Sequence, residues 1–194
     1  MFRTLLKVLL LGAALLSATT AQAVIDENDD TMGLYFDTDG DTDCLDSVAL
    51  LSQVPCYIVL THPTFSELHG FEVGFDYGSE LALMGTELAH DQALNVGSAG
   101  NLIVGFGSPT YTEEATLLAT LNLMYMDPAG QPATITLRGT SPSSLDAAYP
   151  SVLLAGGELM STGIHQPTFT SHMNGICTWD DREAGWEQVK VLYR

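Results

Sequence analysis

The feature that most constrains the fold is a run of alternating apolar and polar residues from Phe71 to Tyr77. Such alternation is typical of a strand with one face in a core and the other in water, because successive side chains point to opposite faces. The pattern predicts that the apolar members point inward and the others outward. The inward set is Phe71, Val73, Phe75 and Tyr77, and the outward set is Glu72, Gly74 and Asp76.

Similar short apolar segments recur along the chain, separated by turn sequences. Residues 127–130 read Asp-Pro-Ala-Gly, which is typical of a β-turn, and Gly156-Gly157 suits a tight hairpin connection. Residues 143–148 are expected to form at most one helical turn. This spacing predicts an all-β, antiparallel β-sandwich. The nine predicted strands are 32–36, 57–61, 68–77, 81–88, 101–106, 117–125, 134–137, 152–154 and 159–164.

The first 23 residues have the pattern of a signal peptide. Arg3 and Lys7 precede an apolar run from Val8 to Leu16, and residues 21–23 form an Ala-Gln-Ala cleavage site. The apolar run is shorter than the roughly 20 residues that a membrane-spanning helix needs. We therefore expect an exported protein with no membrane span after cleavage, located in the periplasm, at the cell surface or outside the cell.

The composition excludes some partners. The sequence has 24 acidic and six basic residues, and removal of Arg3 and Lys7 with the signal peptide would leave four basic residues and a net charge of −20. Phosphate backbones and anionic membrane surfaces would repel such a chain. Nucleic acid is therefore not an expected partner.

Three cysteines, Cys44, Cys56 and Cys177, favour a disulfide in an exported protein. The first expectation is Cys44 with Cys56, which would close a short loop between the first two strands. The alternative is that Cys177 attaches the C-terminal segment to the sandwich.

An acidic run between the first two predicted strands could hold a cation. Alternate carboxylates can face one hard ion, so Asp37, Asp39, Asp41 and Asp43 form a possible Ca²⁺ site. The EF-hand spacing is absent, because the sixth position counted from Asp37 is Thr42 rather than glycine. A solvated acidic loop is the simpler interpretation.

No nucleophile elbow, phosphate-binding loop or His-Glu-x-x-His zinc motif occurs in the sequence, so nothing in it predicts an enzyme. Tyr111 and Tyr149 fall in predicted loops, where exposed rings could stack on sugars. Packing of these rings against the protein is the simpler interpretation.

Three segments, taken in order, resemble the core strands of cohesin modules, which are extracellular and non-catalytic. In residues 71–83, an F-x-V-x-F-x-Y strand leads through a short turn to Leu81. Residues 102–106 resemble the I-x-V-G-F strand of that family, and residues 117–123 resemble its L-A-T-L-x-F strand. The resemblance covers residues 57–164. It implies a jelly-roll sandwich, here residues 24–165, that binds a protein partner through one exposed sheet face.

The expected function is therefore an exported, non-catalytic module that binds a dockerin-like or other surface protein. A carbohydrate-binding module with a polysaccharide ligand is the alternative, followed by a hydrolase whose site is dispersed over loops. Residues 166–194 form a tail that resembles the T-W-G-x-V-K-x-L-Y-R ending of exported bacterial proteins. Trp186, Val189 and Tyr193 would share one face of a short helix there. This tail is either a packed terminal helix or a sorting tag.

Overall fold

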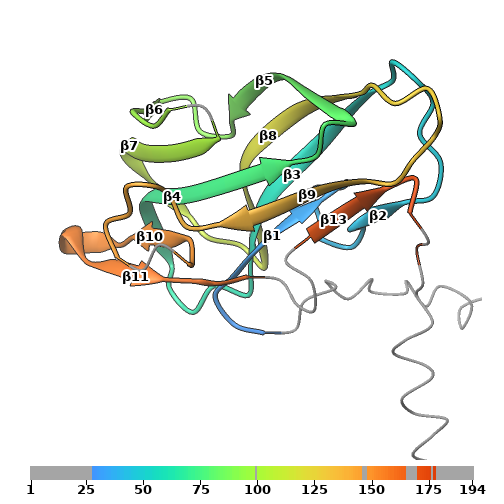
Figure 1. Ribbon diagram of the computed structural model, residues 1–194. Coiled ribbons are helices and arrows are strands. Elements are labelled where there is room, and N and C mark those ends of the chain that lie inside the picture. Colours follow the sequence, from blue (N-terminus) through green and yellow to red (C-terminus); the bar gives the residue numbers. More distant parts are fainter. Residues whose placement is uncertain (1–27, 99, 146–147, 165–169, 176, 178–194) are drawn as a thin grey trace, which may run out of the picture.

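Two β-sheets stack face to face in the computed structural model of the protein (Figure 1). The structure describes residues 28–98, 100–145, 148–164, 170–175 and 177. The predicted signal peptide and the predicted helix of the tail lie outside these residues. Within the described part of the chain, no helix has the length and apolar character needed to cross a membrane.

The first sheet has five strands, and its centre is formed by long segments that sequence alternation predicted. In spatial order the strands are β12 (Gly163–Ile164), β1 (Thr31–Tyr35), β3 (Gln53–Thr61), β8 (Ala115–Tyr125) and β5 (Leu81–Leu88). All neighbours are antiparallel except β1 and β12, which run parallel.

The second sheet is built around the long strand β4 (Glu67–Tyr77). One edge of β4 pairs with β7 (Asn101–Tyr111), which in turn pairs with β6 (Ala93–Asn95). The other edge pairs with two strands that follow one another along it. These are β10 (Ser151–Leu153), which continues to β11 (Leu159–Ser161), and β9 (Ala133–Arg138), which continues to β13 (Thr170–Met173) and β2 (Cys44–Leu45).

The core lies between the sheets, and β4 supplies its centre. Phe71, Val73 and Phe75 are at most 2% exposed, which confirms the predicted inward face. The prediction was wrong for Tyr77, which is 41% exposed at the end of the strand. It was also wrong for Gly74, which is buried because the Arg138 guanidinium and the Gly139 carbonyl cover it.

The structure corrects the predicted strand pattern in three further ways. Thirteen strands are present among the described residues, and two pairs, β1 with β12 and β2 with β13, are parallel rather than antiparallel. The predicted strand 159–164 divides into β11 and β12, which belong to different sheets. The chain crosses between them at Thr162, a buried residue whose amide donates to the Pro150 carbonyl at 3.0 Å.

The predicted turn at 127–130 is confirmed, and its chemistry is local. The Gly130 amide faces the Asp127 carbonyl, and Gly130 has a φ of 69°, a conformation that glycine adopts without strain. The Asp127 carboxylate also accepts from the Gln131 amide at 2.7 Å. Residues 143–145, in contrast, are not helical. They belong to the loop between β9 and β10.

Candidate functional site

The pairing register places one residue from each of five strands in a row across the outer face of the second sheet. Their immediate neighbours Phe71, Val104 and Val152 are buried in the core, so the row itself faces away from it. The row is Leu94 of β6, Gly105 of β7, Gly70 of β4, Leu153 of β10 and Leu159 of β11. Figure 1 shows these strands side by side in this order.

Gly105 forms part of the floor of a hollow between the leucines, and its partner Gly70 is buried beside it in the same row. A Cβ at Gly70 would strike the Val104 carbonyl oxygen, so the backbone at this irregularity of the β4–β7 pairing requires glycine. A Cβ at Gly105 would meet nothing within 4 Å. We call this feature the glycine hollow: Gly105 with the flanking Leu94, Leu153 and Leu159, next to the buried Gly70. Its volume is about 500 Å³.

The wall of the glycine hollow is apolar and open to solvent. Leu94 is 67% exposed and Val96 is 70% exposed, and Ile103 also lines the space. Phe71 and Phe106 also contribute to the lining. Phe71 is only 1% exposed, and Phe106 is half-buried. Exposed aliphatic side chains around a concave floor are a feature of many interaction sites.

A carboxylate stands beside the glycine hollow in the neighbouring row. Glu72 pairs with Ile103 on one side and with Ser151 on the other. The loop between β9 and β10 fixes its side chain, because the Ser144 amide donates to Glu72 Oε2 at 3.1 Å and the Ser144 hydroxyl donates to Oε1. Thr140 makes a longer contact of 3.4 Å to Oε2.

The next row along β4 holds Arg138, the only lysine or arginine in the described part of the chain. Its Nε lies 2.8 Å from Asp76 Oδ2, and its Nη1 donates to Asn101 Oδ1 at 3.0 Å and to the Gly139 carbonyl at 2.9 Å. The Arg138 guanidinium is therefore already bonded to other groups of this sheet face. The electrostatic character of this face is set by its acidic residues.

The predicted calcium ligands lie in the loop between β1 and β2. The Asp41 amide donates to Asp37 Oδ1 at 2.9 Å, while Asp41 Oδ1 is buried without a hydrogen-bond partner among the described residues. Burial, together with the negative charges of Asp37 and Asp39, raises the pKa of Asp41. The carboxylates thus crowd one another.

These four aspartates do not supply a gathered set of ligands. In the described residues, the one group of three potential ligand atoms within 4.8 Å of one another is Cys44, Asp46 and Cys177. Two of its members are joined in a disulfide, so their sulfurs are not thiolates. Calcium binding by Asp37, Asp39, Asp41 and Asp43 stays a prediction.

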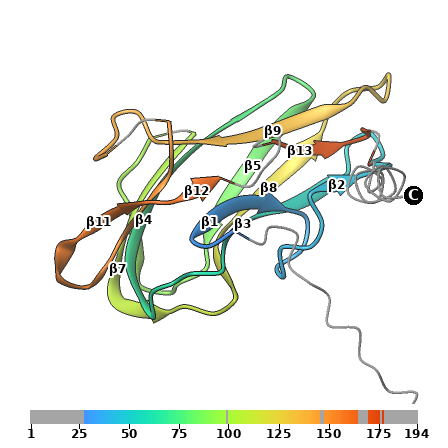
Figure 2. The same cartoon turned by 90° about the horizontal axis from the view of Figure 1, so that it is seen from below.

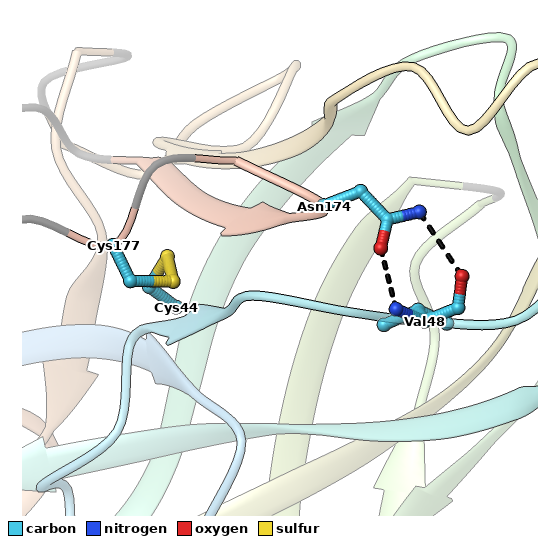
Figure 3. Close-up of a disulfide and its surroundings, with 4 residues drawn as sticks. All are labelled: Cys44, Val48, Asn174 and Cys177. Atoms are coloured by element: carbon cyan, nitrogen blue, oxygen red, sulfur yellow. Dashed lines mark hydrogen bonds between the residues drawn. A yellow bond between two sulfur atoms is a disulfide. The ribbon is translucent and has the colours of Figure 1, made fainter.

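The predicted Cys44–Cys56 disulfide is wrong. Cys44 bonds to Cys177, with 5.6 Å between the two Cα atoms (Figure 3). Cys44 begins the edge strand β2, which runs parallel to β13, so the chain just after β13 passes beside it. Cys56 instead points into the core from β3 and is fully buried, which raises the pKa of its thiol.

A second contact reinforces this attachment of the C-terminal segment. Asn174 Nδ2 donates to the Val48 carbonyl at 3.1 Å, and Asn174 Oδ1 accepts from the Val48 amide (Figure 3). The disulfide and this amide pair hold residues 170–175 and Cys177 on the edge of the second sheet. The glycine hollow is formed by other strands of that sheet, among them β4, β7 and β11, which lie at the opposite end from β13 and β2 in Figure 2.

Tyr111 and Tyr149, the predicted loop tyrosines, are 73% and 42% exposed. Tyr111 ends β7, which is longer than predicted, and neither ring lines the glycine hollow. The structure therefore does not bring these rings together with the apolar site.

Comparison with known proteins gives a fold and no sequence family. No protein-family model matches the sequence, and the curated proteins contain no significant match to it. Solved structures do match. The sixth cohesin of scaffoldin B from Acetivibrio cellulolyticus, solved with a mutant Cel5 dockerin, has 14% identity and a TM-score of 0.53 over 76% of this chain and 99% of that one.

A second structure gives the same result. The second type II cohesin module of the adaptor scaffoldin ScaA, from the same bacterium, has 12% identity and a TM-score of 0.51, covering 77% of this chain and 99% of that one. The chain has a cohesin-like β-sandwich fold. Identities this low show the fold alone.

Sequence reasoning found the cohesin-like core but not the glycine hollow. The row depends on the register of five strands, and β6, one of the five, was not predicted. One signal was available in the sequence. Gly70 and Gly105 each interrupt a strand pattern, and glycine inside a strand often marks a bulge or a place where another group approaches the backbone closely.

Proposed function

We propose that this protein is a non-catalytic module that binds a partner protein through the outer face of β6, β7, β4, β10 and β11. The observation that carries the proposal is the glycine hollow, an apolar concavity of about 500 Å³ on an otherwise acidic molecule. Protein interfaces concentrate their binding energy in a few large side chains that enter such pockets. Paired strands of one sheet form this hollow and fix its shape.

The cohesin-like fold supports a protein partner over a small ligand. The sixth scaffoldin B cohesin was solved as a complex with a dockerin. We propose a partner of dockerin type for this chain. The openness of the site agrees with this, because small-ligand pockets bury most of the ligand surface, whereas Leu94 and Val96 remain largely exposed.

We also propose that the protein works outside the cytoplasm. The Cys44–Cys177 disulfide supports this location, since structural disulfides persist in oxidising compartments. The signal-peptide pattern of the first 23 residues supports it independently.

Quantitative capture from the exported proteins of the source organism tests the proposal. Three baits are compared: wild type, Gly105→Leu and Gly85→Leu. Each variant adds the same side chain where a Cβ meets nothing within 4 Å, in the hollow for Gly105 and on β5 of the other sheet for Gly85.

We expect at least one protein that wild type and Gly85→Leu retain and that Gly105→Leu loses, and that binds again as purified protein. Soluble polysaccharides are passed over the same baits. Retention of a polysaccharide that is lost with Gly105→Leu, and no protein, would favour the carbohydrate-binding alternative and overturn the proposal.

A further inference from the structure

Three acidic residues lie in or next to the lining of the glycine hollow, and no lysine or arginine of the described residues is free to balance them. Glu72 stands in the neighbouring row, Asp91 precedes the lining residue Gln92, and Glu158 precedes Leu159 of the row. Asp91 and Glu158 are exposed. Arg138, the one lysine or arginine of the described residues, is bonded to Asp76 and Asn101.

This charge pattern disfavours a second copy of the chain as the occupant. The sequence carries a net charge of −18, so two copies brought face to face would repel each other. A sugar is disfavoured for a different reason. Ring stacking needs an exposed aromatic face, whereas Phe71 in the lining is 1% exposed. The half-buried ring of Phe106 already stacks on His90, with 4.9 Å between the ring centroids.

We infer that the partner inserts one or two bulky apolar side chains into the glycine hollow from a segment that carries lysine or arginine beside them. This inference rests on the proposed protein-binding function and names the chemistry of the partner. The apolar side chains fill the space over Gly105. The cations face Asp91, Glu158 and the Glu72 carboxylate, which the loop holds in place.

The apolar anchor and the cations of the partner contribute to binding in different ways. The apolar anchor supplies affinity through the burial of hydrophobic surface, which salt does not screen. The cations supply steering and partner choice, and their contribution falls as the Debye length shortens from roughly 10 Å at 0.1 M salt to about 3 Å at 1 M. Binding should therefore weaken with salt and yet not be abolished.

A random peptide library displayed on yeast tests this inference with the full chain as the probe. Peptides that bind wild type are sorted, and each is measured again with Gly105→Leu and with the control Gly85→Leu. We expect peptides enriched in Trp, Phe, Leu or Met next to Lys or Arg. Gly105→Leu should weaken them at least about tenfold, a change typical of a lost anchor, and Gly85→Leu should not.

Two further variants separate a blocked site from a damaged fold. Leu94→Ala removes an exposed rim side chain and should weaken binding about threefold without lowering the melting temperature. The pair Asp91→Asn and Glu158→Gln should weaken binding about threefold at low salt and flatten its salt dependence. The matched pair Glu113→Gln and Glu114→Gln removes two exposed charges just beyond the end of β7 and should do neither.

The outcomes test the inferred chemistry of the partner separately from the proposed binding site. Binders that lose affinity with Gly105→Leu but are acidic, or lack bulky apolar residues, would overturn the inferred chemistry and leave protein binding by this face in place. Binders unaffected by Gly105→Leu, or a library without any binder, would contradict the proposed site itself.

Discussion

The acidic loop between β1 and β2 and the glycine hollow are built by different means. The loop gathers Asp37, Asp39 and Asp41 from neighbouring positions of one segment, and its carboxylates repel one another. The hollow gathers Leu94, Gly105 and their partners from five strands, and its shape is fixed by backbone pairing. The first is a concentration of charge on a surface segment, while the second is a shaped surface on a rigid sheet.

The contrast shows which kind of cluster suits recognition. Charges that are close in sequence can form by composition alone, and water solvates them at little cost. A concave apolar floor forms only if the pairing register is correct. We therefore assign recognition to the hollow and expect the loop to affect stability more than binding.

The largest expected effect concerns the floor beneath the hollow. Phe71 is 1% exposed and its ring centroid lies 6.0 Å from that of Phe106. Phe71→Ala should lower the free energy of unfolding by about 3–5 kcal/mol, because it leaves a cavity in the core. Leu94→Ala, on the rim, should change it by less than about 0.5 kcal/mol in the same urea titration. Equal costs would mean that the hollow has no rigid floor.

The second prediction separates the disulfide edge from the hollow. Replacing Cys44 and Cys177 together by serine should lower the free energy of unfolding by about 2–4 kcal/mol, since the bond closes a loop of 133 residues in the unfolded chain. Binding of a selected peptide should stay within about twofold, a small effect on the affinity scale. Non-reducing peptide mapping checks the pairing, and a peptide linked through Cys56 would contradict the structure.

The third prediction uses the acidic loop and pH. The pKa of Asp41 is raised from its ordinary value of 3.8 in the folded protein. The folded state therefore holds this proton more tightly than the unfolded chain, and the contribution of Asp41 to stability falls as pH rises through the raised pKa. Asp41→Asn should raise the melting temperature at pH 7, and this gain should vanish below pH 3.8.

The exposed Asp46, just after β2, offers the control for this pH experiment. Asp46→Asn should leave the melting temperature nearly unchanged at both pH values. If Asp41→Asn destabilised the protein at pH 7, the Asp41 carboxylate would stabilise the folded loop. That result would contradict the repulsion from Asp37 and Asp39 as its dominant effect.

Calcium is expected to give the smallest effect. A divalent cation would relieve the repulsion between Asp37, Asp39 and Asp41, so millimolar Ca²⁺ should raise the melting temperature slightly more than Na⁺ at equal ionic strength. The variant with Asp39→Asn and Asp41→Asn should lose the difference. The same shift with both salts would identify the segment as a solvated acidic loop.

Sequence reasoning located the long strands well because burial on one face imposes a visible period. The predicted strand 81–88 coincides with β5, and the prediction for β4 differs by one residue. It missed β2, β6 and β13, which are two to four residues long. A segment that short shows no period, and pairing partners decide whether it becomes a strand.

Sequence reasoning gave attachment through Cys177 only as the alternative pairing and did not predict the hollow, for a related reason. Cys44 and Cys177 meet because β2 and β13, more than a hundred residues apart, pair in parallel. Sequence spacing made the nearer Cys56 the natural first choice. In the same way, Gly70 and Gly105 become neighbours only through the shifted register of β4 and β7. Contacts set by tertiary pairing leave little trace in local sequence.

The most direct test of protein binding by the glycine hollow is amide hydrogen exchange of the full chain, with and without the tightest selected binder. Edge-strand amides open locally, so a bound segment protects them. We predict new protection in β6, in the adjoining part of β7, and in β11, and none in β5, β3 or the loop 37–43. Protection confined to β5 and β3, or to that acidic loop, would contradict the account.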